Sequence, residues 1–320
     1  MGPAALGRWV HSLRGPKEEV DPAHPIGWRW DPERALEGET ESVLTVFLAG
    51  AECRFSCTFC DLWRNTLDGP TPIGALPRQL DEALSAAGSP ESAAAIKLYN
   101  ASNFFDRRAV PREDYRAIAE RLKPFGRVVV ESHPKLLGSK ALEFAGMLSG
   151  RLEVALGLEI ADSELLRQLN KDMTLRDFER AVRFLLEAGI AVRAFVLLGP
   201  PFVPREKAVK WAVRSAGYAR DLGATYISII PTRTGSGALD ALMRDGRFEP
   251  PTLDHAEEAL EATLQGATVR TDAVVTLDLW DAERLIACHE CGPRRIDRLA
   301  RMNLSGRLEP RWDCSSCGWR

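Results

Sequence analysis

The sequence predicts an α/β fold, a partial TIM-like (β/α)6 barrel followed by a small C-terminal module with four metal-binding cysteines. Apolar, β-branched runs alternate with amphipathic segments, polar residues or glycine follow the expected strands, and the seven cysteines form two groups with metal-ligand spacing. We expect an irregular N-terminal arm over residues 1–40, the barrel over 41–265 and the metal-binding module over 266–320.

Six runs have the composition of buried strands: Val43–Leu48, Ala94–Leu98, Arg127–Glu131, Leu152–Leu158, Ala191–Leu198 and Ala224–Ile230. Between them lie segments with apolar residues at helical spacing: Pro77–Ala87, Arg112–Leu122, Leu175–Ala188 and Arg205–Leu222. This alternation implies a parallel sheet. Six units fit either an open doubly wound sheet or an incomplete barrel.

The residues after the expected strands favour the barrel. In chain order they are the first cysteine loop, Asn100, Glu131, Glu159, Gly199 and the pair Thr232 and Arg233. Active sites of barrels collect at the C-terminal ends of the strands. We therefore expect these residues to share one mouth.

The segments that flank the barrel are less regular. Residues 1–40 contain Trp9, Trp28, Trp30 and several prolines, so we expect an arm that packs across the barrel. A β-rich stretch, Thr268–Trp280, leads into the second cysteine group, which puts the boundary near Gly266.

Composition indicates a globular protein, because 45% of the 320 residues are hydrophobic and 27% are charged. No apolar run approaches the length of a membrane helix, and the N-terminal stretch has no signal-peptide core, so we expect a cytoplasmic protein without a membrane partner. Clustered thiols in a reducing compartment point to metals and not to disulfides.

The net charge of -3 is unevenly distributed. From Arg284 onward eight arginines stand against four acidic residues, so this segment carries +4 and the remainder -7. Arg294, Arg295, Arg298 and Arg301 recur at helical spacing. They form either a patch that faces nucleic-acid phosphates or a solvated helix face.

The first cysteine group, Cys53, Cys57 and Cys60, has the spacing C-x3-C-x2-C. Three thiolates suit a [4Fe-4S] cluster with one iron that has no protein ligand. The alternative is a zinc site or a ferredoxin-like cluster with a fourth ligand elsewhere. The other cysteines lie more than 200 residues away and already form their own pairs, which favours the open cluster.

The run Cys53-Arg-Phe-Ser-Cys57-Thr-Phe-Cys60 resembles the signature loop of the radical S-adenosylmethionine (radical SAM) superfamily, including the aromatic Phe59 against the cofactor. The resemblance implies that the open iron binds S-adenosylmethionine. It also implies reductive cleavage to methionine and a 5'-deoxyadenosyl radical, with flavodoxin or ferredoxin as electron donor.

Further residues are similar to the branch that contains the elongator-type and coproporphyrinogen-oxidising enzymes. Gly157-Leu-Glu159 and Leu169-Asn-Lys171 resemble two of its motifs. The resemblance implies that Glu159 binds the ribose, that Lys171 pairs with the methionine carboxylate and that Glu131 contacts the cofactor. Asn100 lies where relatives bind the methionine amine with a glycine-rich loop, and Phe195 replaces an acid of some relatives.

The second cysteine group consists of two C-x2-C pairs, Cys288 with Cys291 and Cys314 with Cys317, separated by 22 residues. Four closed thiolates favour a structural Zn²⁺ ion, and a second iron-sulfur cluster is the alternative.

Short motifs around Trp63, Asn100, His133 and Arg233 resemble the family of archaeosine synthase radical SAM subunits. That resemblance implies C–N bond cleavage on a modified tRNA base, with a possible partner subunit. The basic residues Arg233, Arg294, Arg295 and Arg298 are then candidates for substrate contacts. Two alternatives stay open: a radical SAM enzyme for a peptide or small metabolite, and a metal-dependent nucleic-acid-binding protein without turnover.

Overall fold

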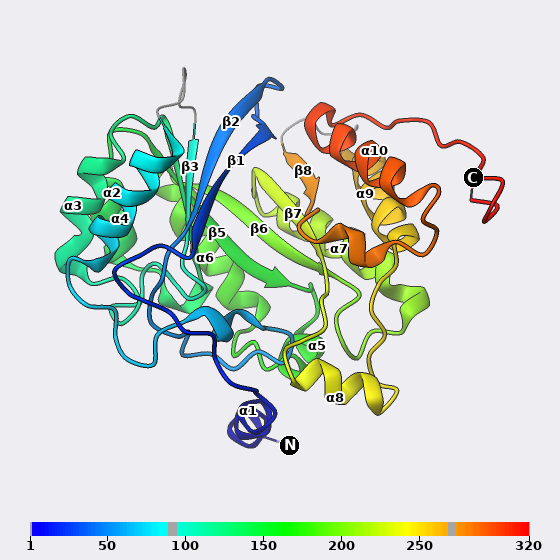
Figure 1. The fold of residues 1–320 in the computed structure, drawn as a ribbon, viewed down its shortest axis with the longest axis horizontal. Helices are drawn as coiled ribbons and strands as arrows, with labels where there is room; N and C mark the ends of the chain where they lie inside the picture. The colour runs from blue at the N-terminus through cyan, green and yellow to red at the C-terminus, as the bar shows by residue number, and fades with distance from the viewer. Residues whose placement is uncertain (1, 89–94, 268–272, 320) are drawn as a thin grey trace.

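The computed structural model describes residues 2–88, 95–267 and 273–319 (Figure 1). In these residues eight strands form one curled sheet in the order β1-β2-β3-β4-β5-β6-β7-β8. Strands β2 to β8 pair in parallel, and β1 pairs antiparallel with β2. The sheet is a half-barrel with helices outside it, which confirms the predicted α/β class.

The strands are β1 Gly27–Arg34, β2 Thr40–Phe47, β3 Ala95–Tyr99, β4 Arg127–Ser132, β5 Arg151–Glu159, β6 Ala191–Leu198, β7 Tyr226–Pro231 and β8 Val274–Leu277. The α-helices are α1 Pro3–Ser12, α2 Ala75–Ala87, α3 Tyr115–Arg121, α4 Ser139–Ala145, α5 Ser163–Gln168, α6 Leu175–Glu187, α7 Ala208–Asp221, α8 Ala238–Arg244, α9 Leu253–Ala267 and α10 Gly292–Ser305. Short 3-10 turns are η1 Leu62–Asn65, η2 Arg112–Asp114, η3 Pro134–Leu136, η4 Arg205–Lys207 and η5 Ala282–Leu285.

All six expected strands are present as β2 to β7, with ends shifted by a few residues. The expected start of the second strand, Ala94, and residues 268–272 of the β-rich stretch lie outside the described residues. Strand β8 lies within the expected β-rich stretch Thr268–Trp280, whereas β1 lies in the segment expected to be irregular, and the two extend the sheet at both edges. The limits of the three predicted parts remain predictions.

The expected irregular arm contains both α1 and β1. Strand β1 tolerates Pro32 because it is an edge strand, where proline leaves no central ladder bond unmade. Trp30 points outward, and its indole Nε1 donates a hydrogen bond to the carbonyl of Ala87 in α2 at 3.0 Å. Pairing with β2 therefore orders a segment whose tryptophans and proline suggested an irregular chain.

Helix α10 lies against both edges of the sheet, since it contacts β1 and β8. The Asn303 side chain donates to the carbonyl of Leu277 and accepts from its N–H, both at 2.8 Å. The amide thus takes the place of a neighbouring strand on the open edge of β8. In Figure 1 α10 lies beside β8, and the C-terminal segment continues outward from it.

The N-terminal side of the barrel interior is filled by charged residues. Arg193, 2% exposed, donates from Nε to Glu153 Oε1 at 2.6 Å and from Nη1 to Glu33 Oε1 at 2.8 Å. Lys97 binds Glu33, and Arg127 binds both glutamates. Burial alone would raise the pKa of Glu33, but the surrounding cations outweigh it and hold the pKa far below its usual value. Pairing offsets the cost of burying these charges.

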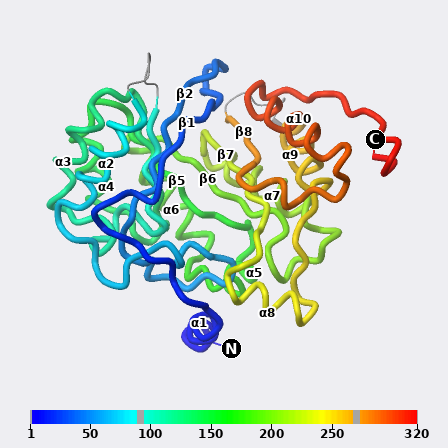
Figure 2. Tube along the Cα trace, viewed as in Figure 1, coloured from blue at the N-terminus to red at the C-terminus, as the bar shows by residue number. Residues whose placement is uncertain are grey.

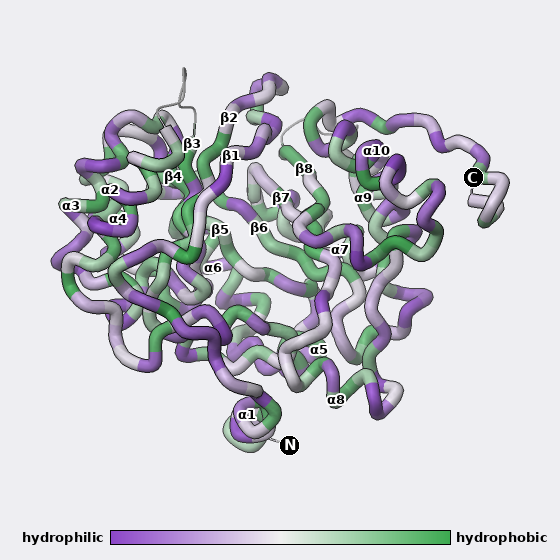
Figure 3. The backbone as a smooth tube through the Cα atoms, in the orientation of Figure 1, coloured by the Kyte–Doolittle hydropathy of each residue, from purple (hydrophilic) through white to green (hydrophobic). Residues whose placement is uncertain are grey.

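The main hydrophobic core lies between the sheet and its outer helices. Along the strands of Figure 3 the chain is mostly hydrophobic, whereas hydrophilic residues gather on the outer helices and loops. Phe104, Tyr115 and Phe144 stack together within this core. The trace in Figure 2 places the two termini far apart on the surface. No helix among the described residues is long and apolar enough to cross a membrane.

Candidate functional site

The loop that follows β2 carries Cys53, Cys57 and Cys60, and other strand-end loops hold it in place. The N–H of Thr58 donates to the carbonyl of Leu169 at 3.0 Å, and Asn170 Nδ2 donates to the carbonyl of Ser56 at 2.8 Å. These bonds connect the loop to the turn after α5. The cysteines are therefore fixed beside the turn that ends in Lys171.

Helix α1 covers this loop from outside. His11 Nε2 lies 2.8 Å from Ser56 Oγ, and the Arg14 guanidinium lies 5.1 Å from the centre of the Trp63 ring. Gly237, with φ of +81°, approaches the carbonyl of Leu13 so closely that a Cβ would collide with it. The N-terminal segment thus packs against the cysteine loop.

Of the three cysteines of this loop, Cys57 is buried, and Cys53 and Cys60 are half-buried. Burial raises the pKa of Cys57 to about 12, although the Lys171 ammonium acts in the opposite direction. Asn103 Nδ2 donates a hydrogen bond to Cys53 Sγ at 3.1 Å. Without a bound cation these thiols would stay protonated, so the arrangement suits ligands that lose their protons to a metal.

Lys171 and Glu159 form a buried ion pair, with 2.6 Å between Nζ and Oε1. Burial disfavours the charged lysine, but Glu159 and the Cys57 sulfur outweigh it and raise the pKa of Lys171. Glu159 has φ of +64°, an uncommon conformation for a residue other than glycine. Gly157 makes room for the pair, because a Cβ there would lie 2.5 Å from Lys171 Nζ and would also collide with Glu159.

The end of β3 contains polar atoms without protein partners. Asn100 is fully buried, and neither its side-chain oxygen nor its nitrogen has a hydrogen-bond partner in the described structure. The backbone N–H of Asn100 donates to Glu131 Oε1 at 2.9 Å. Burial raises the pKa of Glu131 to about 7, although this hydrogen bond acts in the opposite direction. An unpartnered buried amide is costly unless a ligand completes its hydrogen bonds.

Sequence reasoning missed the contributions of Asn103 and His133. His133 stacks on Phe55 with 3.8 Å between ring centres, and its Nε2–H donates to the carbonyl of Lys171 at 2.8 Å. Its backbone N–H donates to Asn103 Oδ1 at 2.6 Å. Burial lowers the pKa of His133 to about 3, which keeps the ring neutral. Both residues stand in segments singled out above, but their partners are distant in sequence.

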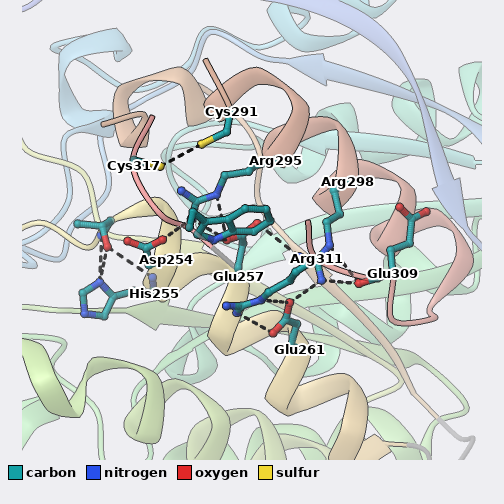
Figure 4. A network of polar contacts seen from close by, with 12 residues as sticks. Asp254, His255, Glu257, Glu261, Cys291, Arg295, Arg298, Glu309, Arg311 and Cys317 are labelled. Carbon is teal, nitrogen blue, oxygen red and sulfur yellow. Dashed lines mark hydrogen bonds and ion pairs between the residues drawn. The ribbon is translucent and has the colours of Figure 1, made fainter. Parts of the chain in front are cut away.

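The second cysteine group lies at the outer end of α10. Among the described residues, the sulfur atoms of Cys288, Cys291, Cys314 and Cys317 all lie within 4.8 Å of one another. Such a set can close around a single ion. In Figure 4 Cys291 and Cys317 face each other beside α10.

Two of the arginines that were expected to form a surface patch are buried. Arg295 and Arg298 are 4% and 1% exposed and bind Glu257 of α9 (Figure 4). The Trp319 indole Nε1 donates to the same carboxylate at 3.0 Å. The sequence interpretation of these two arginines as phosphate contacts was wrong, because their acidic partners on α9 lie 38 to 41 positions away along the chain.

The remaining basic candidates are exposed or partly exposed. Arg294 lies over the Trp312 ring at 4.6 Å, and Arg301 pairs with Glu309. Within the described part of the chain, Arg233, after β7, makes long ion pairs to Asp278 and Asp281, at 3.7 and 3.6 Å.

Comparisons with known proteins agree with the family resemblance found in the sequence. No family model matches the chain. Archaeosine synthase subunit beta of Methanosarcina acetivorans is 27% identical over 249 residues, which cover 74% of this chain and 71% of that protein. The protein of the same name from Thermococcus kodakarensis is 28% identical over 243 residues, 72% of this chain and 75% of its own length.

Among solved structures, methylornithine synthase (PylB), a radical SAM enzyme, has a TM-score of 0.52 at 12% identity and covers 97% of this chain and 88% of its own. The chain resembles the radical SAM enzymes. At this identity the likeness to PylB shows a shared fold, while the likeness to archaeosine synthase subunit beta extends to sequence.

The residues of this radical SAM-like chain fit the two groups that the resemblance implies, an iron-sulfur cluster and S-adenosylmethionine. Three cysteines on one loop can hold an iron-sulfur cluster, and the unpartnered Asn100 amide and the Lys171 ammonium can meet a polar, zwitterionic cofactor. The second group supplies four thiolates and leaves no open position for a substrate.

Proposed function

We propose that this chain is a radical SAM enzyme that modifies a tRNA nucleobase by archaeosine-type C–N bond cleavage. The observation that carries the proposal is the cysteine loop fixed against the Asn170–Lys171 turn, with the unpartnered Asn100 amide at the neighbouring strand end. The likeness to two proteins named archaeosine synthase subunit beta supports the substrate class.

Cys53, Cys57 and Cys60 would hold the [4Fe-4S] cluster. When bound, the reduced cluster supplies the electron that cleaves S-adenosylmethionine to methionine and a 5'-deoxyadenosyl radical. Flavodoxin or ferredoxin would deliver that electron. Asn103 donates a hydrogen bond to the sulfur of Cys53, and α1 packs against the loop through His11 and Ser56.

The chain's polar residues would position the cofactor. Lys171 would pair with the methionine carboxylate, Glu159 would accept hydrogen bonds from the ribose, and Asn100 would meet the methionine amine. Lys171 and Glu159 bind each other in the present structure, so the two side chains that would contact the cofactor already lie together. Glu131 holds the Asn100 backbone in position.

The four remaining cysteines would hold a Zn²⁺ ion, since four closed thiolates suit tetrahedral coordination. The "subunit beta" in the names of the relatives supports the presence of a partner subunit, which would prepare the tRNA base.

The test is 5'-deoxyadenosine formation by the anaerobically reconstituted, reduced protein, with and without tRNA. We expect cleavage that tRNA stimulates and that added salt suppresses, because phosphate contacts weaken steeply with salt. S-adenosylmethionine cleavage that tRNA does not stimulate would favour a peptide or small metabolite as the substrate. Absence of S-adenosylmethionine cleavage in the protein loaded with its cluster would show that the chain is not a radical SAM enzyme.

A further inference from the structure

Four aromatic rings meet inside the half-barrel, directly beneath the candidate cofactor residues. Tyr99 of β3 contacts Phe195 of β6 edge to face, with ring centres 6.3 Å apart. Phe47 of β2 lies 6.5 Å from Tyr99 and 5.7 Å from Trp280, which follows β8. Strands β3 and β6 are not neighbours, so their rings meet across the concave side of the sheet.

The depth of this aromatic layer follows from the strand period of two residues. Tyr99 follows Lys97 and Phe195 follows Arg193 by two positions, so each ring lies one step above the buried charges and on the same face. Phe195 also pairs in register with Gly157, two residues before Glu159. The four rings therefore lie between the buried charged residues of the barrel and the residues that would hold the cofactor.

Exposure distinguishes these rings from those of the core. Phe104, Phe105, Phe144 and Phe178 are completely buried, whereas Phe47, Tyr99 and Phe195 remain partly exposed and Trp280 is 50% exposed. A ring that lies inside the barrel and is still accessible has a side that no protein group covers. Aromatic faces in such a position bind other flat rings through stacking and edge contacts.

The rim beside Trp280 carries charge. Arg233 reaches Asp278 and Asp281 only at 3.7 and 3.6 Å, beyond hydrogen-bond distance, and its side chain is 28% exposed. Its guanidinium therefore has donors available for a phosphate, which it can bind in bidentate fashion.

We propose that Phe47, Tyr99, Phe195 and Trp280 form a platform for one unpaired nucleobase, and that Arg233 binds the phosphate of the same nucleotide. Enzymes that react with a base take it out of its stack and hold it against aromatic side chains. The inference rests on the proposed tRNA-base reaction and names the residues that would choose the substrate.

The test is equilibrium binding of 7-deazaguanosine 5'-monophosphate to the full, anaerobically reconstituted chain, followed by ligand-observed NMR. Trp280→Ala and Phe195→Leu should weaken binding by about 5- to 100-fold, because base–aromatic stacking is sensitive to loss of the ring. Arg233→Gln should weaken binding of the monophosphate but not of the unphosphorylated nucleoside.

Trp28→Ala is the matched control. Trp28 is 36% exposed on β1, and in the alternating strand pattern its side chain lies opposite to that of Glu33, on the outer face. This variant should bind like the wild type. Equal losses in Trp28→Ala, unchanged binding in both platform variants, or no binding by the wild type at millimolar nucleotide would overturn the platform.

A separate assay distinguishes this inference from the proposed reaction. If the wild type fails to cleave S-adenosylmethionine but the platform variants still lose nucleotide binding, the reaction is wrong and the platform stands. If cleavage is normal and nucleotide binding is unchanged in the variants, only the platform is wrong.

Discussion

The two cysteine groups of this chain use the same ligand type in opposite settings. Cys53, Cys57 and Cys60 lie on a loop at the barrel mouth that is bound to the turn after α5 and covered by α1. The other four cysteines gather at the outer end of α10, where Cys317 is exposed. Three thiol donors and the unpartnered Asn100 amide leave room for a further ligand. Four thiol donors complete the coordination of a single ion by themselves. This difference in placement, more than the spacing, supports the proposal that the first group holds a catalytic cluster and the second a structural ion.

The largest expected effect separates the two groups directly. Cys57→Ala should reduce both 5'-deoxyadenosine formation and the visible absorption of the cluster to background, because two thiolates cannot hold the cluster. Cys314→Ala should leave that absorption largely intact while the zinc content falls. Anaerobic metal analysis with absorption spectra of both variants makes the measurement. Equal loss of iron in the two variants would show that the sites are not independent.

The next prediction concerns the attachment of the four-cysteine module. Arg298→Met leaves Glu257 with one arginine fewer and Glu261 without its buried partner, so unfolding free energy should fall by about 3 to 5 kcal/mol. Urea titration measures this change.

Arg294→Ala is the control on the same helix. Since Arg294 is exposed, its loss should change stability by no more than about 0.5 kcal/mol. A result in which Arg294→Ala is the more damaging would contradict the buried network of Figure 4.

A pH series tests the barrel mouth. Burial raises the pKa of Glu131 from 4.5 to about 7, so the folded protein prefers the neutral carboxyl while the unfolded chain ionises freely. This preference stabilises the fold fully below about pH 4.5 and is lost as pH rises toward 7. Relative to Glu131→Gln, the cofactor-free wild type should therefore lose about 2 to 3 kcal/mol of unfolding free energy across this range.

Thermal or urea unfolding of both proteins from pH 4.5 to 8 provides the comparison. Glutamine can still accept the N–H of Asn100, so the variant isolates the charge. If the unfolding free energies of the two proteins changed in parallel with pH, the pKa of Glu131 would not be raised.

The smallest effect is expected from Gly157→Ala. The added Cβ would push Glu159 and Lys171 apart, so S-adenosylmethionine should bind about tenfold more weakly, or by about 1.4 kcal/mol. Gly266→Ala, where a Cβ has no neighbour within 4 Å, is the control. Unchanged affinity in Gly157→Ala would mean that the ion pair takes no part in cofactor binding.

The sequence predicted the parts of the fold that local patterns determine. The central strands β2 to β7 are recognisable as apolar runs, and the cysteine loop, Asn100 and Glu159 lie at strand ends as expected. Strand β1 was missed because its inward residues are Arg29, Asp31 and Glu33. Arg29 and Asp31 pair with each other on β1, and Glu33 is paired with cations on other strands, such as Arg193, 160 positions away.

Long-range pairing explains the other differences as well. The arginines of α10 look like a solvated or phosphate-binding face until Glu257 and Glu261 of α9 are placed opposite them. The unpartnered state of Asn100 and the hydrogen bond from Asn103 to Cys53 likewise depend on how separate loops meet. Neither can be seen in one segment of sequence.

The most direct test of the central claim is electron paramagnetic resonance of the reduced, anaerobically reconstituted protein before and after addition of S-adenosylmethionine. We predict a [4Fe-4S] signal that changes when the cofactor is added, because three cysteines would leave one iron of the cluster without a side-chain ligand. A signal that stays the same at saturating cofactor, or no [4Fe-4S] signal in the iron-loaded wild type, would contradict the account.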